Sequence, residues 1–219
     1  MTYYDIIAHH FSSTRSRLWP DQILFLNKIK PGSEVLDLGC GNARVLQYFK
    51  KINIDYLGID SSRLLLAAAI NNFPNAKFIL GDITKAGTFK NLKKYDYVLL
   101  FAVLHHILTK NAQEKLFKNI SKITKSRAKI FITVWNMKQT KYRTMKSKHK
   151  IFVIPYKFTD GKKVQKEIKR DIFAYEPEDI INLAKNNGYR VLDYFYARKG
   201  VKTYETSGYN LCFELQKEV

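Results

Sequence analysis

The sequence predicts a doubly wound α/β fold, a mostly parallel sheet with helices on both faces and a final antiparallel strand. Three observations predict it. Short apolar runs alternate with helical patterns along most of the 219 residues, which is typical of strand–helix–strand units. The first run, at 34–38, ends in a glycine-rich turn. Two strands with no helix between them, 189–197 and 207–216, close the chain.

Seven segments are expected as strands. The run at 95–102 is almost continuously apolar, as expected of a strand covered on both faces of a parallel sheet. Shorter apolar runs bounded by polar or glycine-containing turns predict the others. In chain order the strands are expected at 34–38, 56–59, 76–80, 95–102, 127–135, 189–197 and 207–216.

Helices are expected between the strands and ahead of the first one. Asp60-Ser61-Ser62 provides capping side chains before a Leu- and Ala-rich segment, and Pro177 and Gly188 bracket a late helix as a first-turn proline and a terminating glycine. In chain order the helices are expected at 3–11, 17–30, from the glycine turn to Lys51, at 62–72, at 110–124 and from Pro177 to Gly188.

Length and composition indicate one globular domain, residues 1–219, with an N-terminal helical cap at about 1–30 and a basic insertion at about 138–170. The longest apolar stretch, 97–104, is too short to cross a membrane, so no membrane partner is expected. The first residues lack the pattern of a secretion signal. Cys40 and Cys212 are the only cysteines, which argues against a disulfide framework or a zinc cluster and favours a cytoplasmic location.

The charge is strongly basic and unevenly distributed. Lys and Arg number 38 against 19 acidic residues, a formal net charge of +19. Residues 138–170 hold 12 basic and 2 acidic residues, a net +10 in 33 positions. Such a segment favours contact with a nucleic-acid backbone, and Lys141, Arg143 and Lys146 are the candidates for that contact. A solvated lysine-rich face, or the codon usage of an AT-rich genome, is the alternative reading.

The glycine-rich turn carries the most specific motif, Asp37-x-Gly39-x-Gly41-x-Ala43. Small residues let the backbone approach a ligand closely. A nicotinamide dinucleotide fingerprint would require its third small residue at position 44. That position holds Arg44, which is too bulky and is expected to be exposed. A turn that only joins a strand to a helix is the remaining structural alternative.

The spacing of this turn resembles the first motif of class I methyltransferases that use S-adenosylmethionine. The resemblance implies a seven-stranded, Rossmann-like methyltransferase sheet and that cofactor. It implies that Asp37 holds the turn's N–H groups or reaches the methionine amine through water, that Asp60 binds the ribose hydroxyls, and that Asp82 accepts from the adenine amine. Helix capping and a turn aspartate are the alternatives for Asp60 and Asp82. The cofactor-binding residues are expected to be Asp37, Gly39, Cys40, Gly41, Asp60, Ser61, Gly81, Asp82 and Ala102.

Longer segments resemble the family that methylates carboxymethyluridine at the tRNA wobble position. They are HFSSTRSRLWPDQILFL (10–26), LDLGCGNARVL (36–46), FAVLHHI (101–107), VWNMKQ (134–139) and, more loosely, IFVIPYKF (151–158) and GYNLCFELQK (208–217). The resemblance implies a tRNA substrate and a small zinc-binding activator protein as partners. One segment departs from the family pattern: its R-Y-Y-H is Arg170-Asp171-Ile172-Phe173 here.

An ester-forming reaction on a carboxylate needs alignment and a cation to hold the carboxylate rather than a strong base. Arg15 and Arg170 are the candidate cations, with His105 or His106 assisting. Trp19 is expected to stack on the base, to close over the cofactor, or to pack at the start of a helix. Adjacent histidines point in different directions, so no metal is expected. The alternatives are a methyltransferase for a small molecule or protein, and a non-catalytic RNA-binding module.

Overall fold

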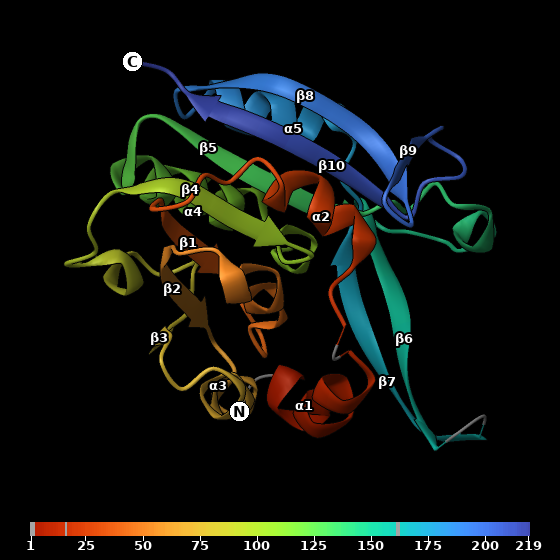
Figure 1. Cartoon of the computed structure of the whole chain (residues 1–219). Coiled ribbons are helices and arrows are strands. Elements are labelled where there is room, and N and C mark those ends of the chain that lie inside the picture. The colour runs from red at the N-terminus through yellow and green to blue at the C-terminus, as the bar shows by residue number, and fades with distance from the viewer. Residues whose placement is uncertain (1–2, 16, 161–162) are drawn as a thin grey trace.

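An eight-stranded sheet forms the centre of the computed structural model, which describes residues 3–15, 17–160 and 163–219 (Figure 1). The strand order is β3-β2-β1-β4-β5-β10-β8-β9. All seven predicted strands are present, with the short β9 added at the edge. The bounds are β1 Glu34–Leu38, β2 Asp55–Asp60, β3 Lys77–Leu80, β4 Tyr95–Phe101, β5 Thr124–Trp135, β8 Tyr189–Arg198, β9 Val201–Thr203 and β10 Asn210–Lys217.

The sheet is parallel from β3 to β5 and antiparallel where β10 lies between β5 and β8. This confirms the doubly wound fold with a final antiparallel strand. β1 pairs with both β2 and β4, so the strand order reverses at β1. In open α/β sheets, ligands bind at the carboxyl ends of the strands beside such a reversal.

Helices cover both faces of the sheet (Figure 1). One apolar cluster joins α2, the 3₁₀ helix η1 and α3 to one face, and another joins α4 and α5 to the other. Ser62 caps α3 by accepting the Leu65 N–H at 3.2 Å, and Pro177 opens α5. The bounds are α2 Pro20–Leu26, η1 Arg44–Lys51, α3 Arg63–Asn72, α4 Lys110–Lys122 and α5 Pro177–Lys185.

Two expectations about helices need correction. The helix predicted at 17–30 is limited to α2, because Pro20 fixes its start and the chain turns at Asn27. The helix after the glycine turn is the 3₁₀ helix η1, which begins from Ala43 in the left-handed region at φ 54°. Positions 1, 2 and 16 of the predicted cap and 161–162 of the basic segment lie outside the described residues.

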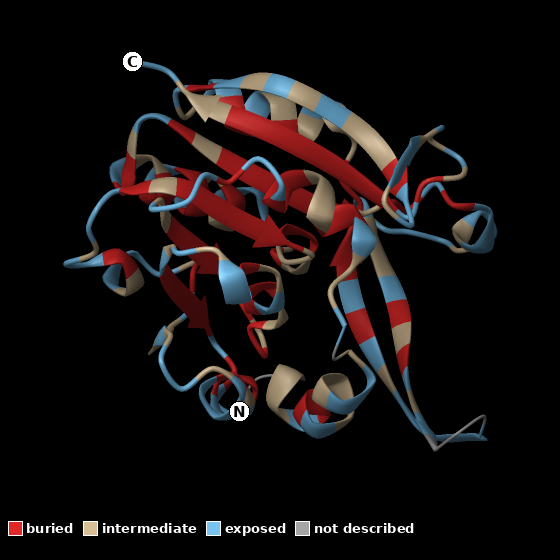
Figure 2. Cartoon of the chain, in the orientation of Figure 1, coloured by how far each residue is buried: buried red, intermediate tan, exposed pale blue. Residues whose placement is uncertain are grey.

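The basic segment, expected to be irregular or partly extended, contains an ordered antiparallel hairpin. It consists of β6 (Ile151–Asp160) and β7 (Lys163–Phe173), preceded by a short 3₁₀ helix, η4 (Thr140–Tyr142). Burial alternates in the half of the hairpin nearest the sheet, where Ile154 and Tyr156 are buried and Lys157 is exposed. The far end of β7, Lys163–Glu167, is exposed throughout (Figure 2). The inner face of the nearer half therefore packs on the protein while lysines occupy its outer face.

The N-terminal helix α1 (Tyr3–Thr14) lies between α3 and the hairpin (Figure 1). Asp5 accepts from the Ser62 hydroxyl at 2.7 Å, and His10 Nδ1 bonds the Tyr156 hydroxyl at 2.9 Å. These contacts hold α1 across the carboxyl ends of the strands. Among the described residues, no helix is both long and apolar enough to span a bilayer, and both cysteines are free and buried.

Candidate functional site

A cavity of about 530 Å³ lies at the carboxyl ends of β1, β2 and β4, under α1 and beside β7. Most of the predicted site residues line it. They are Arg15, Trp19, Asp37, Gly39, Cys40, Gly41, Asp60, Ser61, Gly81, Asp82, Ala102, His105, His106 and Arg170. Residues more than 150 positions apart in the sequence therefore form the wall of one cavity, as the fold class and the motifs together predict.

The glycine turn forms the floor of the cavity. Gly39 and Gly41 adopt φ +72° and +58°, conformations that strain residues with a Cβ. A Cβ on Gly39 would lie 2.4 Å from the Val103 side chain, and one on Gly41 would point between Phe11 and Leu65, each 4.0 Å away. Phe11 and Leu65 themselves line the cavity. A side chain at position 41 would therefore occupy space at the cavity wall.

The N–H groups of the turn donate within the protein. Those of Gly39 and Cys40 bond the Ile59 carbonyl at 2.7 and 3.1 Å, and that of Ala43 bonds the Cys40 carbonyl at 2.9 Å. The Gly41 N–H bonds Asp60 Oδ2 at 2.8 Å. The carboxylate that holds the turn is therefore that of Asp60. Holding the turn was one of the two roles expected for Asp37, and this one is wrong.

Asp37 and Asp60 are both buried beside the turn. Asp60 Oδ1 also accepts the Ser62 N–H at 2.8 Å, so this carboxylate fixes the start of α3 as well as the turn. Asp37 Oδ2 accepts from the Tyr56 hydroxyl at 3.0 Å. Burial raises the pKa of Asp37 to about 7, against the lowering effect of the Tyr56 bond.

Residues after β3 and β4 also line the cavity. Asp82 is exposed and accepts the Thr84 N–H and hydroxyl at 2.8 and 2.7 Å, so it also organises its own turn. A Cβ on Gly81 would lie 2.7 Å from Thr88, so close packing excludes a larger residue there. Ala102 takes a left-handed φ of 58° after β4, which turns the chain sharply into the histidine segment.

The expectation that Arg44 is exposed was wrong. The side chain is half-buried in the cavity wall. Its guanidinium lies over the Trp19 ring, 4.7 Å from the centroid. The cation–π contact explains the position, and it places the Trp19 ring beside the glycine turn from which η1 begins. Its Nη1 atom is buried and has no hydrogen-bond partner among the described residues.

The two histidines after β4 have different partners. His105 is fully buried, stacks on Trp135 at 5.1 Å, and its Nδ1 accepts the Trp135 N–H at 3.4 Å. His106 Nε2 and the Tyr4 hydroxyl are 2.5 Å apart. Burial, and next to it the charge of Arg170, lower the pKa of His106 to about 3. Burial, His106 and Arg170 lower that of His105 well below its usual value, so both rings are neutral at pH 7.

Arg15 and Arg170 meet at one aromatic ring. Arg15 Nη1 donates to the Tyr156 hydroxyl at 3.0 Å, and the Arg15 and Arg170 guanidiniums lie 5.1 and 5.3 Å from the Tyr156 centroid. Arg170 also lies over Trp135 at 4.6 Å. Its Nε is buried with no partner among the described residues. The cations proposed from the sequence are thus brought together.

Sequence reasoning missed Tyr4, Trp135 and Tyr156, which hold the histidines and arginines in place. Trp135 and Tyr156 lie inside segments quoted for the family resemblance, VWNMKQ and IFVIPYKF, so their positions carried a usable signal. The partner that each ring meets depends on the fold, because more than 100 positions separate Tyr4 from His106 and Arg15 from Tyr156.

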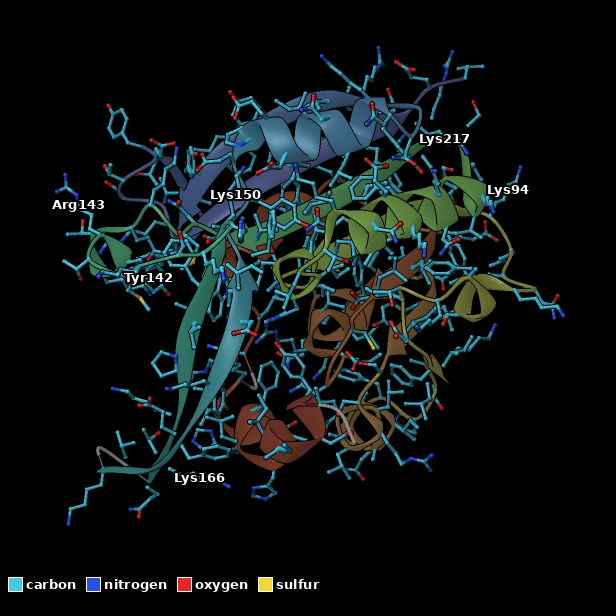
Figure 3. All side chains as sticks on the ribbon, turned by 180° about the vertical axis from the view of Figure 1, so that it is seen from behind. Lys94, Tyr142, Arg143, Lys150, Lys166 and Lys217 are labelled. Carbon is cyan, nitrogen blue, oxygen red and sulfur yellow. The ribbon has the colours of Figure 1, made fainter. Side chains whose placement is uncertain are left out.

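Lys141, Arg143 and Lys146 do not line the cavity. They are exposed on and after η4, beside the base of the hairpin, where Figure 3 shows Tyr142 and Arg143. Lys150 and Lys166 follow along the same hairpin, whereas Lys94 and Lys217 lie at the opposite end of the molecule (Figure 3). In the described part of the chain, no three His, Cys, Asp or Glu residues cluster in a way that could hold a metal ion.

The cavity lining fits S-adenosylmethionine. Position 41 admits no side chain without filling cavity space. Buried carboxylates lie at the ends of β1 and β2, where ammonium and ribose hydroxyl groups would find acceptors. Orphaned polar atoms of Arg44, Gln22, His105 and Arg170 belong to residues that line the cavity.

Comparison with known proteins identifies methyltransferases as similar to this chain. Residues 11–194 match the family described as "Methyltransferase domain". The tRNA (carboxymethyluridine(34)-5-O)-methyltransferase of Arabidopsis thaliana is 32% identical over 136 residues, which cover 62% of this chain and 32% of the relative. The aligned part thus spans about a third of that relative's length.

Two solved structures share the fold. An S-adenosylmethionine-dependent methyltransferase from Clostridium acetobutylicum has a TM-score of 0.74 at 18% identity, with 100% of both chains covered. A Haloferax volcanii methyltransferase in complex with the Trm112 methyltransferase activator has a TM-score of 0.71 at 13% identity, with 99% of this chain and 96% of that one covered. With the family match extending from α1 into β8, the chain belongs to the methyltransferase-domain family.

Proposed function

We propose that this protein methylates the carboxyl group of carboxymethyluridine at the wobble position of tRNA, with S-adenosylmethionine as methyl donor. The name of the Arabidopsis relative and the family resemblance support the substrate. The cavity wall formed by His105, Arg170 and Arg15 supports the chemistry independently, because its polar groups suit an anionic acceptor.

Two buried N–H donors without partners carry the proposal. The backbone N–H of Trp135 donates a hydrogen bond to His105 Nδ1. The proton of the neutral ring therefore lies on Nε2. That Nε2 and the Arg170 Nε have no hydrogen-bond partner among the described residues. Leaving buried donors unpaired is costly. A carboxylate offers only acceptors and satisfies both, whereas an amine substrate would bring further donors.

The histidines favour a nucleophile that carries no proton. An efficient general base has a pKa near the working pH, and the pKa values of His105 and His106 lie far below it because both rings are buried. A carboxylate is already ionised at pH 7 and needs no base. The donors therefore align the acceptor, and the rings of Tyr4 and Trp135 line the cavity beside them.

S-adenosylmethionine, when bound, supplies an electrophilic methyl group. We assign Asp60 to the ribose hydroxyls and Asp82 to the adenine amine, each at the end of its strand, and the glycine turn to close backbone approach. Arg15 and Arg170 hold the acceptor carboxylate by charge and by N–H donation, and they leave a lone pair of its attacking oxygen aligned with the methyl group. Trp19 closes the cavity at the methionine end.

Transfer RNA is proposed to bind along the hairpin and the η4 loop. Lys141, Arg143 and Lys146 are exposed and in no ion pair among the described residues. Lys138 and Lys150 of the same segment, in contrast, pair with carboxylates at 2.6–2.7 Å. Lys141, Arg143 and Lys146 are therefore the side chains whose charge is available to bind phosphates.

The test is nucleoside mass spectrometry on tRNA that carries the unesterified carboxymethyl group. The protein, with and without a small zinc-binding activator of the family, is incubated with methyl-labelled cofactor. The expected product is a labelled methyl ester on the wobble uridine that mild alkali removes. Matched tRNA with an unmodified uridine is the control. Label in an alkali-stable nucleoside, or none in RNA, contradicts the proposal.

A second candidate, a methyltransferase of a small molecule or a protein, is favoured by one observation. Ile172 and Phe173 stand in place of the second Tyr and the His of the family's R-Y-Y-H segment. They are 0% and 4% exposed. They offer no polar group to a nucleotide. In this case tRNA would not bind in a salt-dependent way, and labelled methyl groups would appear in the metabolite or protein fraction.

A further inference from the structure

The chain between β8 and β10 carries exposed aromatic rings together with unpaired cations. Tyr204 is 84% exposed and Tyr209 is 39% exposed. The Arg198 guanidinium lies over the Tyr209 ring, 4.9 Å from the centroid. In the described part of the chain the Tyr204 side chain makes no hydrogen bond or ring contact. Exposed apolar side chains that gather in one place, rather than singly, mark interaction sites.

The loop that carries these rings is fixed to the rest of the protein. The Gly208 N–H donates to the Tyr204 carbonyl at 3.0 Å, and the Tyr209 N–H donates to the Ala197 carbonyl at 2.7 Å. A Cβ on Gly208 would lie 2.6 Å from the Cβ of Tyr196, so the loop packs closely on β8. Because its backbone is held in this way, the loop presents the rings with little entropy left to lose on binding.

The same loop is anchored beside the cavity. Trp19 and Trp135 line the cavity wall. Asn136, the residue after Trp135, donates from Nδ2 to a carbonyl of the loop at 2.9 Å. Asp21, two positions after Trp19, accepts the Gly200 N–H at 2.6 Å. The exposed rings therefore belong to a segment that is attached next to both tryptophans of the cavity.

This segment also adjoins the surface proposed for phosphate contacts. Gln139 Nε2 donates to the Tyr209 carbonyl at 3.2 Å, and η4, which contains Lys141, begins at the next residue. β9 lies on the side of the molecule that carries the β6–β7 hairpin (Figure 1). The exposed rings thus extend the basic surface toward β9.

The charges around the rings favour an anionic partner. Glu205 pairs with Lys138 at 2.7 Å, and Asp193 pairs with Lys202 at 2.7 Å, so these carboxylates are neutralised. Arg198 is exposed and makes no ion pair among the described residues. Aromatic rings beside free cations suit single-stranded nucleic acid, whose bases stack on aromatic and guanidinium planes while its phosphates meet positive charge.

We propose that Tyr204, Tyr209 and Arg198 form a stacking platform for unpaired bases that flank the methylated nucleotide of the RNA acceptor. The inference rests on the proposed function in taking that acceptor to be RNA. The platform contributes stacking, whereas Lys141 and Arg143 contribute charge. A duplex keeps its base faces stacked on one another, so the platform favours a single-stranded loop over a helical stem.

Fluorescence anisotropy with two labelled probes tests the platform: a short oligouridylate and an RNA duplex of the same length. For Tyr204→Ala we expect about 5- to 100-fold weaker binding of oligouridylate, the range for one lost stacking partner. The affinity for the duplex should not change. The slope of log K against log salt should also stay the same, because no charge is removed. Tyr204→Trp keeps a stacking ring and should restore the affinity.

Two further variants separate stacking from charge and from general surface effects. Arg198→Lys keeps the charge but loses the planar guanidinium, so oligouridylate should bind more weakly with an unaltered salt slope. Tyr194→Ala is the matched control. Tyr194 is 46% exposed, and its ring stacks on Phe213 at 5.3 Å rather than under a cation. Its truncation should leave the oligouridylate affinity unchanged.

Equal losses for both probes, or the same loss from Tyr194→Ala, would overturn the platform. So would a Tyr204→Ala protein that binds oligouridylate normally but no longer binds a small zinc-binding activator of the family, because the surface would then bind protein. Nucleoside mass spectrometry keeps the two proposals apart. A labelled wobble ester with no effect of Tyr204→Ala on oligouridylate refutes the platform alone. The expected effect with no label in RNA refutes the proposed methyl acceptor alone.

Discussion

Arg15 donates from Nη1 to the hydroxyl of Tyr156 at 3.0 Å, which joins the segment after α1 to the β6–β7 hairpin across the mouth of the cavity. The same hydroxyl bonds His10 Nδ1 at 2.9 Å. A tyrosine that is only 2% exposed thus positions a candidate substrate-binding arginine and the helix that covers the cavity.

Tyr156→Phe should separate these roles from cofactor binding. The ring and its cation contacts remain, but Arg15 and His10 lose their shared partner. We expect a loss of about 1–2 kcal/mol in the free energy of unfolding and about a tenfold lower kcat/KM for the RNA acceptor. The affinity for S-adenosylhomocysteine should not change. Urea unfolding, steady-state kinetics and calorimetry measure the three quantities, and a weaker cofactor affinity would contradict the positioning role.

Asp60→Asn should weaken cofactor binding and leave RNA binding intact. The amide keeps one acceptor oxygen for the Gly41 or Ser62 N–H but loses the charge that strengthens its hydrogen bonds. We expect at least about tenfold weaker S-adenosylhomocysteine binding, equivalent to about 1.4 kcal/mol. Glu178→Gln, the same carboxylate-to-amide change at an exposed position of α5 that does not line the cavity, is the matched control. Equal losses of cofactor and RNA affinity would show that the two sites are not separate.

Charge reversal of Lys141, Arg143 and Lys146 to Glu should weaken tRNA binding and reduce its salt dependence. Each lost phosphate contact lowers the slope of log K against log salt by about one. Filter binding at several salt concentrations measures that slope.

The matched control reverses Lys94, Lys115 and Lys118, which are exposed and make no ion pair among the described residues. Lys94 lies at the end of the molecule opposite the hairpin (Figure 3). The same net charge change there should leave the slope unaltered. Equal slopes for the two variants would mean that the basic segment is a solvated face.

His106→Gln should flatten the loss of stability in acid. The pKa of His106 is lowered to about 3, whereas the unfolded chain binds the proton at about 6.5. Between these values the unfolded state holds more protons, so stability falls as pH falls, by up to about 1.4 kcal/mol per pH unit. Urea unfolding of both proteins from pH 7 to pH 4 measures the difference. Parallel curves would show that His106 is protonated in the folded protein.

The sheet was predictable because its strands are short apolar runs bounded by polar or glycine-containing turns, a pattern that can be read locally. The run 95–102 became β4, and the Leu- and Ala-rich segment after Ser62 became α3. The hairpin was not predictable in the same way. Lysines and exposed Val153 and Val164 interrupt its alternation, because only one of its faces packs on the protein.

The cavity-lining residues were predictable from motifs at strand ends, since a parallel sheet brings those ends to one edge. The burial of Arg44 was not. Nothing near it in the sequence shows that Trp19, 25 positions earlier, covers it. Of the two roles expected for Asp37, holding the turn was wrong, because the register of β1 and β2 places Asp60 rather than Asp37 against the Gly41 N–H.

The main chain of Arg15 contacts the glycine turn. Its carbonyl accepts from Asn42 Nδ2 of the glycine turn at 3.4 Å, while its side chain holds the hairpin. One residue thus contacts both the glycine turn and the hairpin. Reciprocal linkage then applies: the factor by which S-adenosylhomocysteine changes the affinity for tRNA must equal the factor by which tRNA changes the affinity for S-adenosylhomocysteine. Truncating Asn42, which also lines the cavity, to Ala should move both factors toward one together.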